Sequence, residues 1–257
     1  MRRMVGAVCV AFTLAPAFAG ASVTRPIVSL TASPAHITLM GTDREAIRVT
    51  NSGRSRVVAD IRRAGFSLDL RGRPKIVQGG ARSARRWIAV RPGRLTLGPG
   101  KSASLAIASK VPAGAEPGDH DALLLLTTRP RLHSGVAVRM RMGIVVDVRA
   151  PGTVVRRLVL RRLRVVSRAR TRVLELLVAN RGNVTESLAS SRVRVSLSRH
   201  GRFLASLRTG ERELLPRSRG VLQFRYRGAV RGWVTARTEL ESDFDGSVTW
   251  RTFRIRL

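Results

Sequence analysis

The sequence has a single cysteine, Cys9, and it lies within the first twenty residues. Once that segment is removed, disulfides and thiolate zinc sites are both excluded. The four histidines are scattered, and none stands in an H-x-H or H-x-x-x-H spacing. We therefore expect no metal and no cofactor, and a fold that depends on its apolar core.

Long apolar runs are absent beyond the N-terminus. The longest, such as residues 122–126, have the length of a strand and fall short of the ~20 residues that cross a bilayer. The N-terminus itself combines Arg2 and Arg3, an apolar stretch over residues 5–14, and the cleavage-site pattern Ala17-Phe18-Ala19. We expect residues 1–21 to be a signal peptide, with an uncleaved anchor as the alternative, and the mature chain to lack a transmembrane segment.

Acidic residues and lysine are also scarce. Sixteen acidic residues stand against 48 basic ones, the formal net charge is +32 at pH 7, and three of the basic residues are lysines. Such an excess of arginine is typical of a GC-rich genome, and equally of a selected polyanion-binding surface. Export argues against nucleic acid as the partner and leaves wall polymers and anionic lipid headgroups as polyanions outside the cell.

Alternation of apolar and polar residues with a period of two dominates the rest of the chain. Examples are residues 47–50, 104–107, 136–140 and 193–197, in which arginine supplies much of the polar face. Glycine, proline and asparagine interrupt the pattern about every ten residues. Many short alternating strands separated by such turns predict an all-β fold of the sandwich type.

A repeat divides the chain into two similar parts. A strand ending in Asn51-Ser52-Gly53 is matched by one ending in Asn180-Arg181-Gly182, and we interpret both as tight turns, whose positive φ asparagine and glycine tolerate. A Leu-rich turn before a second strand follows in both parts, at residues 95–100 and 213–216. We predict two tandem immunoglobulin-like β-sandwich domains, at 22–151 and 152–257, with the boundary at a Pro-Gly turn.

The turn motifs resemble those of the bacterial WxL-interacting protein family of exported surface proteins. Residues 97–102, 111–120 and 139–152 are similar to turns and a closing strand of its peptidoglycan-binding domain. Residues 178–184 and 214–216 are similar to the second domain. The resemblance implies a partner in peptidoglycan or an anionic wall polymer, or in another surface protein, and a place in the cell envelope.

Two basic clusters are candidate envelope-binding sites. The first consists of Arg82, Arg85, Arg86 and Trp87, where an indole next to guanidinium groups can stack on a glycan. Its alternative is a core strand beginning at Trp87 beside a solvated loop. The second consists of arginines on one predicted strand, with a codon-biased solvated face as the alternative: Arg156, Arg157, Arg161, Arg162 and Arg164.

Other polar and aromatic motifs receive structural interpretations. Asp243-Phe244-Asp245-Gly246 lacks the later acidic ligands of a calcium loop and is predicted to be a hairpin turn. Asp119-His120-Asp121 is predicted to be a turn before a strand, since no nucleophile motif accompanies it. The aromatic residues other than Trp87, among them Trp233 and Trp250, are expected in the core.

These features predict a non-catalytic, secreted protein that binds the cell envelope. The alternative is an assembly module similar to the periplasmic pilus chaperones, which also use two immunoglobulin-like domains and bind a client by β-augmentation. An envelope hydrolase with paired carboxylates is a more distant alternative.

Overall fold

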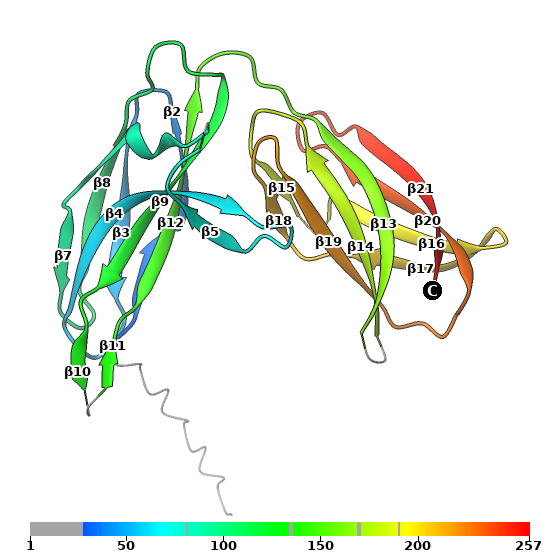
Figure 1. Ribbon diagram of the computed structural model, residues 1–257, viewed down its shortest axis with the longest axis horizontal. Coiled ribbons are helices and arrows are strands. Elements are labelled where there is room, and N and C mark those ends of the chain that lie inside the picture. The colour runs from blue at the N-terminus through cyan, green and yellow to red at the C-terminus, as the bar shows by residue number, and fades with distance from the viewer. Residues whose placement is uncertain (1–27, 81, 134–135, 169–170, 190) are drawn as a thin grey trace, which may run out of the picture.

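The protein is all-β, as the alternating pattern predicts. The computed structural model describes residues 28–257 except 81, 134–135, 169–170 and 190, so the predicted signal peptide lies outside the described residues. Two immunoglobulin-like sandwiches follow one another along the chain and meet at an angle, which gives the molecule the shape of an arch (Figure 1). The prediction of tandem immunoglobulin-like β-sandwiches is confirmed.

The first sandwich packs one sheet of order β1-β3-β8-β6 against another of order β2-β12-β9-β4-β5, with β7 paired to β4. Its strands and single 3₁₀ helix are β1 (Leu30–Ser33), β2 (His36–Met40), β3 (Arg44–Asn51), β4 (Val57–Leu68), β5 (Pro74–Val77), η1 (Ala84–Arg86), β6 (Ile88–Arg91), β7 (Arg94–Leu97), β8 (Ser102–Ser109), β9 (Gly118–Thr128), β10 (Arg131–His133), β11 (Val136–Val138) and β12 (Arg141–Ala150).

The second sandwich packs the sheet β13-β14-β19 against the sheet β17-β16-β20-β21, with the short pair β15-β18 beside them. Its strands are β13 (Leu158–Arg168), β14 (Thr171–Asn180), β15 (Glu186–Leu188), β16 (Val193–Arg199), β17 (Arg202–Arg208), β18 (Arg212–Leu214), β19 (Arg219–Tyr226), β20 (Trp233–Glu241) and β21 (Val248–Arg256).

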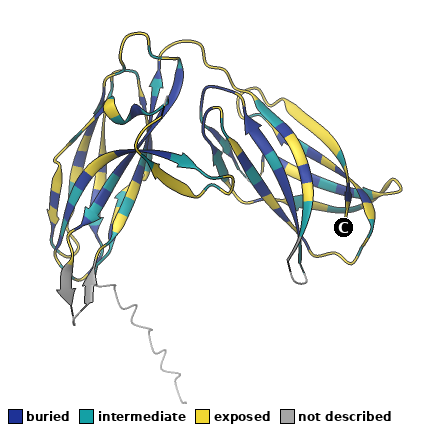
Figure 2. Cartoon of the chain, viewed as in Figure 1, coloured by how far each residue is buried: buried dark blue, intermediate teal, exposed yellow. Residues whose placement is uncertain are grey.

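Each sandwich has a core built from alternate residues of its strands. In the first, Ile47 and Val49 of β3 face inward with Leu105 and Ile107 of β8, and all four are at most 1% exposed. Burying a side chain of this size stabilises the fold by about 1.5–3 kcal/mol. The intervening residues face outward, so buried and exposed bands alternate along the strands (Figure 2). This is the pattern expected of half-buried antiparallel strands.

The asparagine of the repeated Asn-x-Gly motif makes buried hydrogen bonds, whereas the sequence suggests a tight turn with positive φ. Asn51 is fully buried, and its side-chain N–H groups donate to the carbonyls of Ser55, Leu97 and Gly98 at 2.8–3.1 Å, while its Oδ1 accepts from the Gly53 N–H. The asparagine therefore ties the end of its strand to the Leu-rich turn. Neither Asn51 nor Gly53 has a positive φ.

The second sandwich repeats this arrangement. The Asn180 side chain donates to the carbonyls of Val184, Leu214 and Leu215 at 2.8–3.1 Å and accepts from the Gly182 N–H. Asn180 is 1% exposed. The two parts of the sequence repeat resemble each other because both sandwiches build this buried asparagine tie.

The two sandwiches contact each other around the start of β9. The Asp119 N–H donates to the Asn183 carbonyl, and the Asp119 carboxylate accepts from the Thr185 N–H at 2.7 Å. Gly118 approaches so closely, with φ +106°, that a Cβ there would lie 2.1 Å from the Asn183 carbonyl oxygen. Leu215 of the second sandwich packs against Phe66 and Leu123 of the first.

The hairpin predicted at residues 243–246 is confirmed, and a second hairpin joins β16 and β17. β16 and β17 are joined at His200 and Gly201, which both have positive φ, as two-residue hairpin turns require. β20 and β21 pair along their whole length around the turn that contains residues 243–246. No helix in the part of the chain that the structure describes has the length and apolar character needed to span a membrane.

Candidate functional site

One candidate binding feature of the first sandwich is an edge of β12. β12 pairs antiparallel with β9 along its whole length, but its other neighbour, β2, pairs with Val145–Arg149 alone. No described strand pairs with residues 141–144 on that side. We call this part of β12 the open edge. It lies next to the β10–β11 hairpin, at the end of the first sandwich away from the joint (Figure 1).

The backbone direction at the open edge follows from the hydrogen bonds on either side. The Met140 carbonyl accepts a hydrogen bond from the Thr128 N–H, and the Met140 N–H donates to the Thr128 hydroxyl. The even-numbered residues of this segment therefore point their backbone groups toward β9. The Val145 N–H donates to Ala35, which places the odd-numbered residues on the side of β2. Arg141 and Gly143 therefore direct their N–H and C=O groups to the open edge.

The side chains at the open edge alternate. Met140 and Met142 are partly buried against the first core and Ile144 is fully buried, whereas Arg139, Arg141 and Gly143 are exposed. The sequence continues this alternation upstream with Val136 and Val138, whose side chains lie outside those described. An unpaired edge with an alternating apolar face is a template for a further strand.

The other end of β12 is fixed to the second sandwich. Asp147 is buried and accepts a hydrogen bond from His36 at 3.0 Å, and the other ring nitrogen of His36 lies 3.2 Å from Glu213 of β18. Hydrogen bonds to Asp147 and then to Glu213 raise the pKa of His36 from 6.5 to about 10. His36 is therefore a charged link between the sandwiches at neutral pH.

Asp119, His120 and Asp121 begin strand β9 and do not form the turn that we predict from the sequence. Asp119 binds the Arg149 guanidinium through two hydrogen bonds of 2.6 and 3.0 Å. The His120 ring packs 4.2 Å from the Trp87 ring, and desolvation lowers its pKa. Burial and the charge of Asp147 raise the pKa of Asp121. All three residues take part in contacts that hold β9 in place.

The first predicted basic cluster is largely occupied by contacts within the first sandwich. Arg82 pairs with Glu116, Arg85 donates to the Gln78 carbonyl at 2.5 Å, and Arg86 is exposed. Trp87 follows η1, is partly buried against the core and contacts His120. Trp87 thus precedes strand β6, which begins at Ile88.

The second predicted cluster divides into paired and unpaired arginines. Arg164 binds the buried carboxylate of Glu175 through two hydrogen bonds, and Arg156 pairs with Glu186 at 2.9 Å. Arg157, Arg161 and Arg162 are exposed. These three arginines form no ion pair with any residue that the structure describes. The five arginines therefore differ in whether a carboxylate neutralises their charge.

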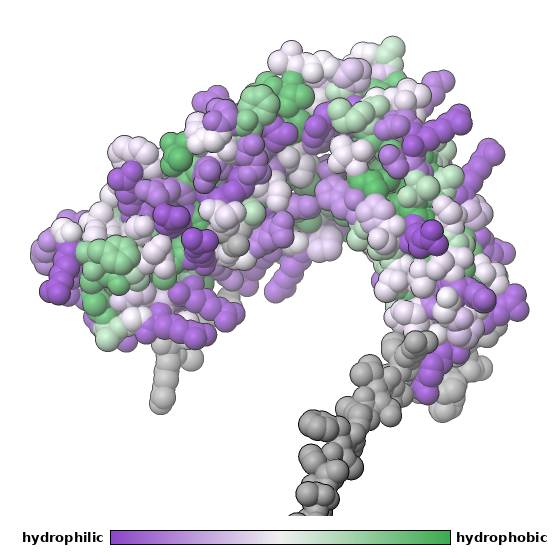
Figure 3. Space-filling view, turned by 180° about the vertical axis from the view of Figure 1, so that it is seen from behind, coloured by the Kyte–Doolittle hydropathy of each residue, from purple (hydrophilic) through white to green (hydrophobic). Residues whose placement is uncertain are grey.

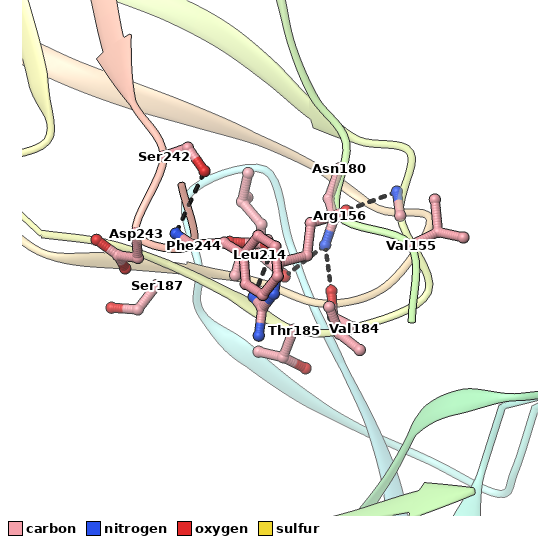
Figure 4. A network of polar contacts seen from close by, with 12 residues as sticks. Val155, Arg156, Asn180, Val184, Thr185, Ser187, Leu214, Ser242, Asp243 and Phe244 are labelled. Carbon is pink, nitrogen blue, oxygen red and sulfur yellow. Dashed lines mark hydrogen bonds and ion pairs between the residues drawn. The ribbon is translucent and has the colours of Figure 1, made fainter. Parts of the chain in front are cut away.

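A polar network surrounds the β20–β21 turn (Figure 4). Arg192 is 6% exposed, pairs with Asp243 at 2.7 Å, and donates to the carbonyls of Glu241 and Ser187. Asp245 accepts hydrogen bonds from Ser247 of the same turn. Among the described residues no group of acidic, histidine or cysteine side chains has the arrangement of a metal site. The β20–β21 turn is therefore held in place by the contacts of Arg192.

Four aromatic residues predicted to lie in the core are exposed, and for them the prediction is wrong: Trp233, Trp250, Phe203 and Phe244. Trp233 is 54% exposed beneath the guanidinium of Arg254, and Trp250 is 59% exposed beneath that of Arg237. The sequence contains a signal for this, because Trp233 alternates out of phase with Val234 and Ala236. Phe224 and Tyr226 are buried, as predicted.

No family model matches the chain, and no curated protein matches it either. Solved structures of chaperones are similar in overall arrangement. A chaperone in a CFA/I fimbrial chaperone–tip adhesin complex is 13% identical, with 87% of this chain and 98% of that chain covered and a TM-score of 0.49. A chain of the CsuC–CsuE complex of Acinetobacter baumannii Csu pili is 14% identical, with 88% of this chain and 98% of that chain covered and a TM-score of 0.47. The Escherichia coli chaperone DraB is 13% identical, with 90% of this chain and 98% of that chain covered and a TM-score of 0.45.

These findings contradict the resemblance to the WxL-interacting family, and with it the prediction of cell-wall or peptidoglycan binding. Structures of fimbrial and pilus chaperones are among the similar ones, and some contain a partner, which is a tip adhesin or, in Salmonella enterica SafA–SafB, a pilin. The physical reason for the error lies in the motifs. The turns at residues 97–102 and 214–216 are the hydrogen-bond acceptors of Asn51 and Asn180, so any sandwich with this buried tie has them.

Proposed function

We propose that this protein is a non-catalytic, extracytoplasmic assembly module that holds a client protein by β-augmentation at the open edge of β12. The observation that carries the proposal is the unpaired outer side of Arg141 and Gly143 in a strand that is otherwise fully paired. A client strand laid there satisfies main-chain groups of both partners. Main-chain hydrogen bonds supply affinity in this mode of recognition, and alternate side chains supply specificity.

The open edge is already ordered before a client arrives. β9 pairs with all ten residues of β12, and Arg149 and Asp147 fix the far end of the strand through Asp119 and His36. A preformed strand loses little conformational entropy on binding, so more of the interaction free energy remains as affinity. The partly buried Met140 and Met142 give the edge an apolar face that adapts to different neighbours.

The place of action follows from the N-terminal sequence. Arg2 and Arg3, the apolar residues 5–14 and Ala17-Phe18-Ala19 have the plan of an export signal. A client with an unpaired strand that reaches the same compartment needs protection from aggregation, because exposed sheet edges pair with one another. Masking such an edge requires binding and no catalytic group.

The test removes one edge hydrogen-bond donor without disturbing the pairing to β9. Arg141→Pro deletes the outward N–H, whereas Arg141→Ala keeps this N–H and removes only the side chain. The proteins that co-purify with the exported chain from its native host are identified by mass spectrometry. We expect the principal client to be lost or at least tenfold depleted with Arg141→Pro and retained with Arg141→Ala.

The thermal midpoints of both variants serve as the control for folding. Equal retention of the client by the proline variant and the wild type would contradict the proposal. So would a client that carries no alternating strand.

A further inference from the structure

A concave surface lies in the second sandwich, far along the chain from β12. A hollow of about 440 Å³ opens where β14 ends and where β13 and β19 begin. Ala179, Asn180 and Ser218 line it together with five arginines. We call it the arginine basin, after Arg157, Arg161, Arg181, Arg217 and Arg219.

The strand register brings these arginines together. Leu158 lies opposite Asn180, and Ala179 lies opposite Arg219, so three strand ends meet at one end of the sheet. The Arg181 N–H donates to the Arg157 carbonyl at 2.7 Å, which closes the gap between β13 and β14. The arginines therefore converge although up to sixty-two residues separate them in the sequence.

Two backbone irregularities aim side chains at the basin. The register of β13 and β14 shifts between Leu160 and Arg162, so Arg161 is the extra residue of a β-bulge. Bulges re-aim side chains, and here two consecutive arginines are exposed where alternation allows one. Arg217 has a φ of +54°, a conformation uncommon for residues other than glycine. Such an outlier is a reason to look for a function at that position.

The charge in the basin has little compensation. No carboxylate lines it, and within the described residues the side chains of Arg157, Arg161, Arg181 and Arg219 have no ion-pair partner. Arg217 alone has one, at 2.6 Å from Glu116. Like charges in a shared concavity repel one another and focus a positive potential, and both effects favour a bound anion.

We propose that the arginine basin binds a phosphate-bearing ligand. A guanidinium offers paired donors that match phosphate or carboxylate oxygens. A carboxylate brings one negative charge and two oxygens, which one or two arginines satisfy. A phosphate ester brings up to two charges and three oxygens, and a diphosphate brings more, so a phosphate group matches five converging guanidiniums better. The hollow falls within the usual size range of small-molecule sites.

The chain offers a closely matched control for this site. Arg161 and Arg162 are adjacent exposed residues on β13, and only Arg161 lines the basin. Arg219 and Arg225 are both exposed on β19, and only Arg219 lines it. The double variants R161A/R219A and R162A/R225A therefore remove the same charge from the same two strands. All four side chains are exposed, so both variants are expected to fold, and thermal midpoints verify this.

The experiment is calorimetric titration of pyrophosphate into each protein at constant ionic strength of about 0.15 M, where charges separated by more than about 8 Å are screened. We expect saturable binding to the wild type, a dissociation constant at least about tenfold higher for R161A/R219A, and less than about a twofold change for R162A/R225A. Equal weakening in both variants would show diffuse attraction and overturn the site, as would the absence of binding to the wild type.

A second arm separates the two sources of phosphate. Co-sedimentation with phosphatidylglycerol vesicles, compared with phosphatidylcholine vesicles, measures recognition of lipid headgroups. Selective loss of vesicle binding in R161A/R219A assigns the basin to a membrane phosphate. Vesicle binding that is unchanged in that variant, together with weakened pyrophosphate binding, assigns it to a soluble phosphate compound. Neither arm involves β12, so this proposal and the client-binding proposal can fail separately.

Discussion

Asn51 and Asn180 show how one residue type organises each sandwich. Each side chain has two N–H donors and one carbonyl acceptor, and each makes four contacts with backbone groups that come from two separate segments. Buried backbone groups that lose their partner cost about 1–3 kcal/mol each. No other side chain of similar size combines donors and an acceptor in this geometry.

We expect Asn51→Ala and Asn180→Ala each to lower the free energy of unfolding by about 2–4 kcal/mol, because several buried carbonyls lose their donors. Chemical denaturation measures the loss. Hydrogen exchange then locates it, and we expect faster exchange in β3 and β8 for the first variant and in β14 and β19 for the second. A change below about 0.5 kcal/mol would show that water replaces the asparagine.

At the scale of the element, β12 has two parts with different roles. Residues 145–149 lie between β9 and β2 and carry the groups that contact the second sandwich. Residues 141–144 have one neighbour. Residues 145–149 fix the position of the strand, and residues 141–144 leave the backbone groups on one side free to pair with a further strand.

The link through His36 makes the attachment of β2 and β12 to the second sandwich dependent on pH. The unfolded chain releases the proton near pH 6.5, whereas the folded chain keeps it until the pKa of about 10. The stabilisation is therefore complete below pH 6.5 and is lost as the pH rises toward 10. We expect His36→Asn to lower the thermal midpoint at pH 6 and to have little effect at pH 10.5.

The control is His200→Asn, since His200 is exposed in the β16–β17 turn and asparagine tolerates its positive φ. Comparing the two variants separates the loss of the His36 link from the loss of an exposed histidine. A difference between His36→Asn and wild type that does not vary with pH would mean that His36 is uncharged at neutral pH.

The strands themselves could be predicted from the sequence because a half-buried strand must alternate. Residues 193–197 illustrate this, with Val193, Val195 and Leu197 all fully buried. What alternation cannot provide is the identity of the neighbouring strand. The open edge of β12 depends on where β2 stops pairing, and the purpose of Asn51 depends on a turn forty-six residues away, so both required the fold.

The candidate sites, like the strands, could be predicted from the sequence only in part. The arginines at residues 156–164 are predicted to form one cluster, but they have different surroundings in the fold. Arg157 and Arg161 line the basin, Arg156 and Arg164 pair with Glu186 and Glu175, and Arg162 does neither. Neither the bulge at Arg161 nor the pairing of Arg164 is visible in the local sequence. The remaining members of the basin, Arg181, Arg217 and Arg219, come from segments that only the strand register brings together.

At the scale of the whole molecule, the two sandwiches form an arch, and hydrophilic residues are spread over both of them among apolar ones on the face that Figure 3 shows. Many of the sixteen acidic residues are engaged in ion pairs, including Asp60, Glu116, Asp119, Glu175 and Glu186. The excess of arginine therefore remains exposed. A surface of one charge keeps copies of the chain apart, and the open edge of β12 is then available to a partner of different charge.

The most direct test of the account is amide-resolved hydrogen exchange of the chain alone and with its co-purified client. The amides of Arg141 and Gly143 face the open edge, whereas those of Met142 and Ile144 face β9, so one strand contains both probe and control. We predict fast exchange at Arg141 and Gly143 in the free chain, at least about tenfold slowing with the client, and slow exchange at Met142 and Ile144 in both states. Unchanged exchange at Arg141 and Gly143 in the complex would contradict strand addition at β12.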